Sequence, residues 1–118
     1  MRAKDAVGAY GERVAVRFLA DAGYAVLDRN WRCRAGELDV VAVRGGVVVF
    51  VEVKCRRSSA FGAPASAVTS SKIARLRAAA SLWLAEHDLA DADVRFDVVS
   101  VLRPLRGAAE VEHVEGAF

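Results

Sequence analysis

The sequence contains little cysteine, no marked excess of charge of either sign and no long apolar run. Its two cysteines, Cys33 and Cys55, are too few for a disulfide framework, and neither histidine lies at a zinc-ligand spacing from them. No stretch approaches the roughly 18 apolar residues that span a bilayer, and the first residues lack the apolar core of a signal peptide. We therefore expect a cytoplasmic protein, not associated with a membrane, whose cysteines are structural or incidental.

The composition is that of one folded domain, which we expect to span residues 1–118. Hydrophobic residues make up 54% and charged residues 27% of the chain, proportions typical of a globule and not of a disordered tail. The formal net charge is only +2, so the chain has no bulk basic field. Any affinity for nucleic acid must therefore come from local clusters of lysine and arginine.

Hydrophobic periodicity predicts two helices and four or five strands. Two adjacent apolar stripes predict a helix over about Lys4–Ala22, which Gly23 would end. A second helix is expected to begin after a cap at Thr69, Ser70 or Ser71. Strands are expected over residues 24–30, 37–43, 47–54, 94–102 and 111–114. This order predicts an α/β fold, a three-layer sandwich whose central mixed sheet of four to five strands is flanked by helices.

The pair Gly45-Gly46 is a strong hairpin signal, and it determines how the second and third expected strands pair. If these glycines form the turn, Asp39 lies opposite Glu52 and Glu37 lies opposite Lys54. Because strand side chains alternate between faces, all four charged side chains then emerge on one face. A slip of one residue would place them on opposite faces.

Two opposed carboxylates suggest a cation between them. Directly opposed Cβ atoms lie about 4.5–5.5 Å apart, so Asp39 and Glu52 would repel each other if left alone. Mg²⁺ or Mn²⁺ fits such a position because these ions prefer oxygen ligands, and Lys54 could then contact a bound water or a phosphate oxygen. The alternative is an ordinary ion pair between Glu37 and Lys54 beside two solvated acids. Hairpin geometry alone leaves both interpretations open.

Two further features could extend this site. Glu12 lies beside the apolar stripe of the first helix, next to Gly11, and it would be either a third carboxylate over the sheet or a rim glutamate. Lys72 lies in the first turn of the second helix, where the macrodipole disfavours cations. It would be either part of a solvated helix start or part of a phosphate-binding rim, which we predict to comprise Arg56, Arg57, Lys72 and Arg75.

The sequence GELDVVAV followed by VEVK resembles the D…ExK core of the restriction-endonuclease-like, or PD-(D/E)xK, superfamily. Nearly the whole chain resembles the small bacterial YraN family. The residues that carry this resemblance are Gly11-Glu12, Asn30, Gly36-Glu37-Leu38-Asp39, Phe50-Val51-Glu52-Val53-Lys54, Lys72 and Ala117-Phe118. Leu38 stands where the superfamily often has a proline before its aspartate.

The resemblance implies a nuclease site at one edge of the sheet. It implies that Asp39, Glu52 and Glu12 hold Mg²⁺ or Mn²⁺, that Lys54 is the catalytic lysine, and that Glu37 tethers Lys54 or assists a second metal. The implied activity is metal-dependent hydrolysis of DNA, with branched, recombination and repair intermediates as candidate substrates and a homodimer as the candidate assembly. Two alternatives remain: a nucleic-acid-binding protein that keeps the nuclease fold without turnover, and an oligomeric scaffold whose polar cluster is structural.

Overall fold

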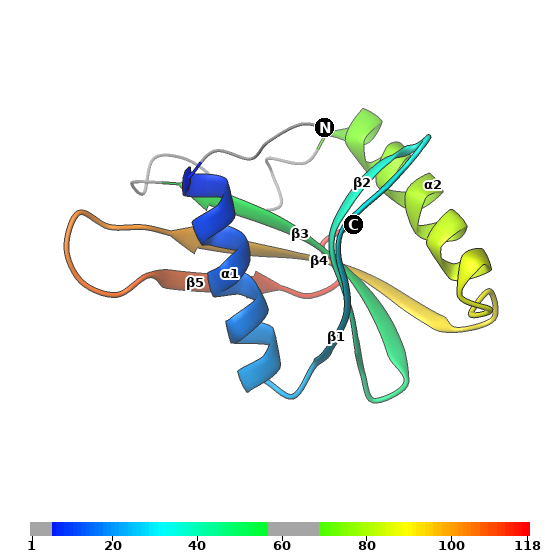
Figure 1. The fold of residues 1–118 in the computed structure, drawn as a ribbon, viewed down its shortest axis with the longest axis horizontal. Helices are drawn as coiled ribbons and strands as arrows, with labels where there is room; N and C mark the ends of the chain where they lie inside the picture. Colours follow the sequence, from blue (N-terminus) through cyan, green and yellow to red (C-terminus); the bar gives the residue numbers. More distant parts are fainter. Residues whose placement is uncertain (1–5, 57–68) are drawn as a thin grey trace.

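The computed structural model describes residues 6–56 and 69–118, which form a five-stranded sheet between two helices (Figure 1). The elements in chain order are α1 (Ala6–Asp21), β1 (Ala25–Cys33), β2 (Gly36–Arg44), β3 (Val47–Arg56), α2 (Ser70–Glu86), β4 (Asp93–Leu102) and β5 (Glu110–Val114). The predicted α/β architecture, a mixed sheet of four to five strands flanked by helices, is confirmed.

The helix ends agree with the sequence signals wherever the structure describes them. Thr69 caps α2, because its side-chain oxygen accepts the backbone N–H of Lys72 at 3.1 Å. The expected start of the first helix near Lys4 lies outside the described residues. Neither described helix, of 16 and 17 residues, is long and apolar enough to cross a bilayer.

The strands lie in the order β1-β2-β3-β4-β5, with β3 and β4 parallel and the other neighbours antiparallel. The hairpin register predicted for β2 and β3 is confirmed from the pair Arg44–Val47 to the pair Val40–Val51. Gly45 and Gly46 have φ values of 58° and 78°, which a two-residue hairpin turn requires at both central positions. The turn therefore allows one register, and the apolar residues stabilise it.

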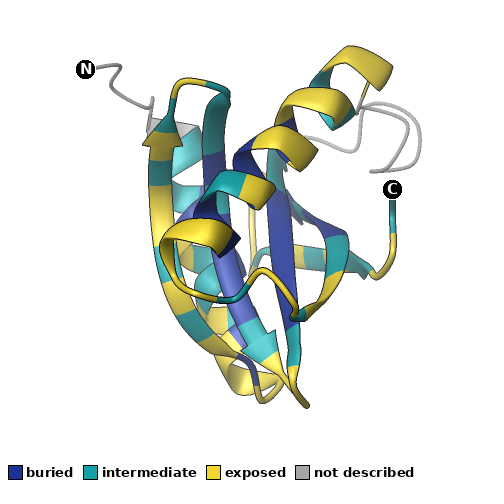
Figure 2. Ribbon diagram, turned by 90° about the vertical axis from the view of Figure 1, so that its right-hand side faces the viewer, coloured by how far each residue is buried: buried dark blue, intermediate teal, exposed yellow. Residues whose placement is uncertain are grey.

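Strand β3 separates two hydrophobic cores, which explains why it is apolar on both faces. Val49 and Val51 pack beneath α1 together with Leu19, whereas Phe50 packs beneath α2 together with Trp83. Figure 2 shows the buried residues along the central strands, while the outer surface of α2 is exposed. The two helices thus cover opposite faces of the sheet.

Helix α1 approaches β3 closely because Gly11 carries no side chain. A Cβ atom placed on Gly11 would overlap the Cβ of Cys55 and lie 2.8 Å from its Sγ. Because the Cβ of Cys55 is bonded directly to the strand backbone, it cannot rotate out of the way. Helix α1 therefore packs directly against the backbone of β3 at Gly11.

A buried charged group, which we call the Asp97 cluster, joins β4 to β5. Arg95 donates two hydrogen bonds of 2.8 Å to the fully buried Asp97 carboxylate, and the His113 Nε2 atom lies 2.6 Å from it. The Gly116 N–H also donates to Asp97, and Arg95 donates to the Tyr24 hydroxyl at 2.6 Å. Burial alone would raise the pKa of Asp97, but these hydrogen bonds outweigh it and hold the pKa below its ordinary value.

The residues after β5 pass from the Asp97 cluster to the opposite face of the sheet. The Ala117 N–H donates to the Phe96 carbonyl at 2.8 Å, and the Phe118 ring lies 5.4 Å from the Phe96 ring. Phe96 lies 5.5 Å from Phe50 in the core beneath α2. This segment therefore contacts residues on both faces of β4, Asp97 on one and Phe96 on the other.

Gly11→Ala should lower the free energy of unfolding by about 2 kcal/mol, although alanine normally stabilises a helix interior by about 1 kcal/mol relative to glycine. The added methyl group would meet Cys55, so α1 must move away from the sheet. Urea unfolding followed by circular dichroism would measure the change. Ala20→Gly, at an exposed site of the same helix, is the control and should cost about 1 kcal/mol. A more stable Gly11→Ala protein would contradict the close approach.

Asp97→Asn should destabilise the protein in a pH-dependent manner. Because the folded pKa of Asp97 lies below the unfolded value of about 3.9, its charge stabilises the fold above that pH, and this contribution is lost as the pH falls through the folded pKa. We expect the variant to be about 3 kcal/mol less stable at pH 7, and the difference to shrink below about pH 4. Urea unfolding across this range would measure it, with the exposed Asp93→Asn as the control. A difference that stays constant in acid would contradict the role of the charge.

Candidate functional site

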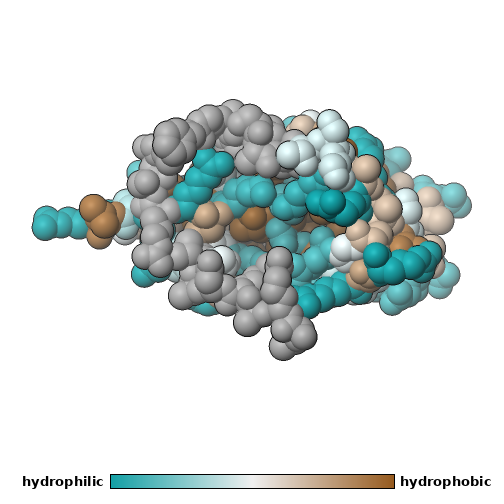
Figure 3. All heavy atoms as spheres, turned by 90° about the horizontal axis from the view of Figure 1, so that it is seen from above, coloured by the Kyte–Doolittle hydropathy of each residue, from teal (hydrophilic) through white to brown (hydrophobic). Residues whose placement is uncertain are grey.

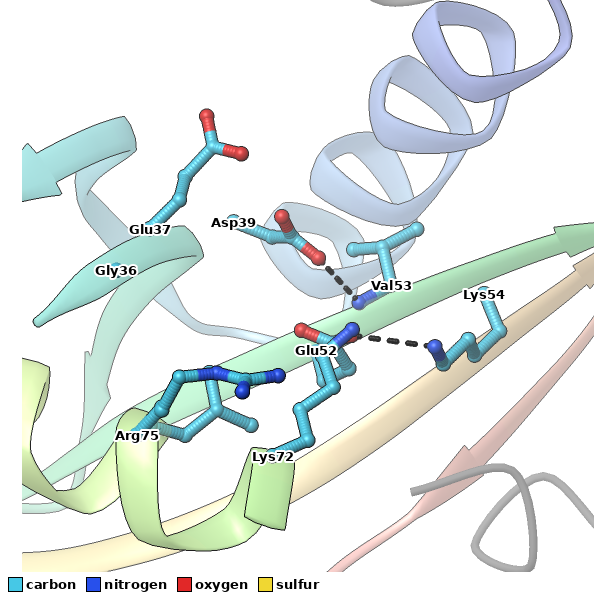
Figure 4. A pocket seen from close by; sticks show the side chains of 9 residues that line it. Gly36, Glu37, Asp39, Glu52, Val53, Lys54, Lys72 and Arg75 are labelled. Atoms are coloured by element: carbon cyan, nitrogen blue, oxygen red, sulfur yellow. Dashed lines mark hydrogen bonds and ion pairs between the residues drawn. The ribbon is translucent and has the colours of Figure 1, made fainter. Parts of the chain in front are cut away.

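A pocket of about 380 Å³ lies between β2, β3 and the first turns of α2 (Figure 4). Most of the predicted site residues that the structure describes meet in it. Its lining consists of Gly36, Glu37, Asp39, Glu52, Val53, Lys54, Lys72, Arg75 and Leu76. Hydrophilic atoms are also prominent on the described part of the face that carries the start of α2 and the β1–β2 turn (Figure 3).

The pocket exists because β2 and β3 separate. The ladder of paired residues between them ends at Val40–Val51, one pair before Asp39 and Glu52 would meet. Instead, the Asp39 Oδ2 atom accepts the backbone N–H of Val53 at 2.9 Å. Beyond this point β2 follows β1 along α2 (Figure 1). The predicted register is therefore right, but the ladder stops before the acidic pair.

Glu52 is the buried centre of the pocket. Its side chain is only 5% exposed, and its Oε2 atom lies 3.3 Å from the Nζ of Lys54. The Lys72 ammonium group contacts the same oxygen from α2. Burial alone would lower the pKa of Lys72, but its hydrogen bond to Glu52 and the charges of Glu52 and Asp39 outweigh burial and raise the pKa. Lys72 is therefore a protonated cation in the pocket at neutral pH.

Glu37 does not lie opposite Lys54 in the ladder, so the predicted cross-strand pair is wrong, while the role of Glu37 in catalysis stays a prediction. Its Oε2 atom lies 3.3 Å from the Nε of Arg32 on β1. In Figure 4 the Glu37 carboxylate points away from Glu52 and Lys54. The separation of β2 from β3 carries Glu37 toward β1, so it contributes to the pocket wall but lies apart from the ammonium group.

Glu12 lies on α1, which packs on the opposite face of the sheet from α2. Its side chain is buried, with 5% exposed, and it does not line the pocket of Asp39 and Glu52. Across residues 6–56 and 69–118, no group of three or more His, Cys, Asp or Glu side chains is placed so that it could hold a metal ion. A role of Glu12 as a third ligand remains a prediction.

The predicted basic rim is distributed over two elements. Arg75 lies on the exposed side of α2, where it donates a hydrogen bond of 3.3 Å to Ser71. Arg56 ends β3, and its carbonyl accepts the N–H of Arg103 at 2.8 Å. Arg57 lies outside the described residues.

The oxygen donors of the pocket fit a hard divalent cation. Mg²⁺ commonly binds through one or two carboxylates and completes its shell with water and phosphate, and Asp39 and Glu52 supply two such groups. The pocket already holds one cation against Glu52, the Lys72 ammonium, which the charge of Asp39 also stabilises. The two acids therefore create a position that attracts positive charge.

Asp39→Ala should lower the free energy of unfolding by about 1–3 kcal/mol, because the Val53 N–H would lose its acceptor. Asp39→Asn keeps an acceptor oxygen and should cost less than about 1 kcal/mol. Urea unfolding in the presence of a metal chelator would compare the two variants without a contribution from bound metal. Equal losses for alanine and asparagine would contradict a structural role of this hydrogen bond.

Comparisons with known proteins identify the family. Residues 11–101, which include every residue that lines the pocket, match the model described as "Uncharacterised protein family UPF0102". A UPF0102 protein of Beutenbergia cavernae is 62% identical over 116 residues, which cover 98% of each chain. One from Frankia alni is 58% identical over 118 residues, covering 100% of this chain and 98% of the relative, and one from Streptomyces griseus is 52% identical over 117 residues, covering 98% of each. The chain therefore belongs to the UPF0102 family, which is the YraN family that its motifs resemble.

Proposed function

We propose that this protein is a metal-dependent endonuclease of the restriction-endonuclease-like (PD-(D/E)xK) superfamily, which hydrolyses phosphodiester bonds of DNA in the cytoplasm. The observation that supports this most directly is the meeting of Asp39, Glu52 and Lys54 in one pocket. Branched DNA of the kind formed in recombination and repair is the first substrate class to test. Action as a homodimer, with one pocket for each strand, remains a prediction.

Charged residues in and near the pocket have separate tasks in the proposed reaction. Asp39 and Glu52 would hold Mg²⁺ or Mn²⁺, which supplies Lewis-acid catalysis of phosphodiester hydrolysis when bound. Lys54, whose Nζ lies 3.3 Å from Glu52, would donate a hydrogen bond to the attacking water or to a phosphate oxygen as negative charge develops. Arg56 and Arg75 would bind neighbouring phosphates of the DNA backbone.

The acidic residues favour hydrolysis over simple binding. A surface that only binds phosphate gains nothing from carboxylates, because both groups are negatively charged and repel each other. Asp39 and Glu52 nevertheless line the same pocket as three basic residues, Lys54, Lys72 and Arg75. Acids and bases in one pocket are expected where a divalent cation bridges protein and phosphate oxygens.

One observation favours a second candidate, a nucleic-acid-binding protein without turnover. Two lysines of the protein itself, Lys54 and Lys72, already neutralise Glu52. A pocket satisfied in this way does not need a metal ion to be stable. Calorimetric titration of Mn²⁺ separates the candidates, because the binding protein predicts no site that depends on Asp39 and Glu52.

Purified protein should cut linear, nicked or four-way DNA in the presence of Mg²⁺ or Mn²⁺, and a chelator should abolish cleavage. Glu52→Gln, which removes a charge that would hold the metal, and Lys54→Met, which removes the ammonium donor, should each lower the cleavage rate by at least about 100-fold. Gel-based cleavage assays would measure the rates. Thermal unfolding would show that the variants remain folded.

Glu112→Gln, at an exposed position of β5, is the matched control and should cleave at the wild-type rate. If wild-type protein cuts none of these substrates with either metal, the proposed activity is wrong. Full activity in folded Glu52→Gln or Lys54→Met would show that cleavage takes place elsewhere.

A further inference from the structure

Lys72 lies inside the pocket, whereas the sequence suggested a place on its rim. Its ammonium group contacts the Glu52 Oε2 atom, which the Lys54 Nζ approaches to 3.3 Å. Figure 4 shows both amines beside the Glu52 carboxylate, although they come from different elements, β3 and α2. Two ammonium groups thus meet at one carboxylate oxygen.

The location of Lys72 in the helix makes this contact informative. Its backbone N–H donates to the Thr69 cap, so the residue lies in the first turn of α2, where the helix dipole disfavours a positive charge. The ion pair with the buried Glu52 carboxylate compensates for this. The lysine is therefore held by the acids of the pocket and not by its own helix.

The Lys72 ammonium group can leave the Glu52 carboxylate more readily than the Lys54 ammonium group can. The Lys72 side chain is 35% exposed, compared with 23% for Lys54. Lys54 lies on β3, two residues from Glu52, and its backbone is paired with Ser100 of β4. Lys72 reaches Glu52 across the pocket from α2, so a change of side-chain rotamer is enough to withdraw its charge.

We propose that Lys72 is a displaceable internal cation, which occupies Glu52 in the absence of metal and gives way when a divalent cation binds. The withdrawn ammonium group is then available to a phosphate oxygen of the substrate, so metal binding and phosphate binding become linked. This inference rests on the proposed metal site at Asp39 and Glu52. It assigns Lys72 a role different from that of Arg75, which lines the same pocket and donates to Ser71.

Titration of Mn²⁺ into DNA-free protein by calorimetry tests the inference directly. Lys72→Met removes the competing cation, and we expect it to bind Mn²⁺ about tenfold more tightly than wild type, the effect of one charge at such close range. Lys72→Gln should behave in the same way. Arg75→Met, which removes a charge one turn further along the helix, is the matched control and should change the affinity by less than about threefold.

Thermal unfolding supplies a second readout that does not depend on catalysis. In the presence of a chelator, Lys72→Met should unfold at a lower temperature than wild type, because Glu52 and Asp39 lose a counter-charge. Saturating Mn²⁺ should raise the unfolding temperature more in the variant than in wild type. In cleavage assays the variant should be slower despite its tighter metal binding.

The outcomes separate this inference from the proposed function. Equal Mn²⁺ affinity in wild type, Lys72→Met and Lys72→Gln would overturn the role of Lys72. It would not contradict the proposed metal site at Asp39 and Glu52. Weaker Mn²⁺ binding in the folded variants would also overturn it, since Lys72 would then assist the metal. Absence of Mn²⁺ binding in all three proteins would overturn both proposals. Binding only after Lys72 is replaced would support the inference most strongly.

Discussion

The hydrogen bond from the Val53 N–H to the Asp39 carboxylate is the interaction on which the pocket depends. It takes the place of a ladder bond where β2 leaves β3, so the strands can separate without leaving a buried N–H group unpaired. The separation opens the space in which Glu52 meets Lys54 from β3 and Lys72 from α2. One carboxylate therefore ends the strand pairing and also forms part of the pocket that results.

Much of this arrangement could be predicted from short-range patterns. The order of elements follows from hydrophobic periodicity, and the register follows from Gly45-Gly46 because a two-residue turn permits one pairing. The same pattern placed Asp39, Glu52 and Lys54 together. It failed at Glu37, because alternation along a strand does not encode where two strands separate. The position where the two strands separate depends on β1 and α2, because β2 stays paired with β1 and in contact with α2 beyond it.

Long-range packing accounts for the other features that sequence reasoning missed. A helix start at Lys72 was predictable, but the reach of its side chain to Glu52 depends on how α2 lies over β2. The hydrogen bond from the Arg103 N–H to the Arg56 carbonyl forms because β3 and β4 are parallel neighbours. Arg95 and Asp97 stand two residues apart in β4, which was a signal of an ion pair on one face, but the third member, His113, comes from a separate strand.

The segment from Gly116 to Phe118 connects the two faces of the sheet. Its first residue is tied to Asp97 beneath α1, and its last ring lies in the other core, where it lines a small apolar cavity with Asp39 and Glu52. A single short stretch of chain therefore joins the buried Asp97 to the apolar wall beside the acidic pocket.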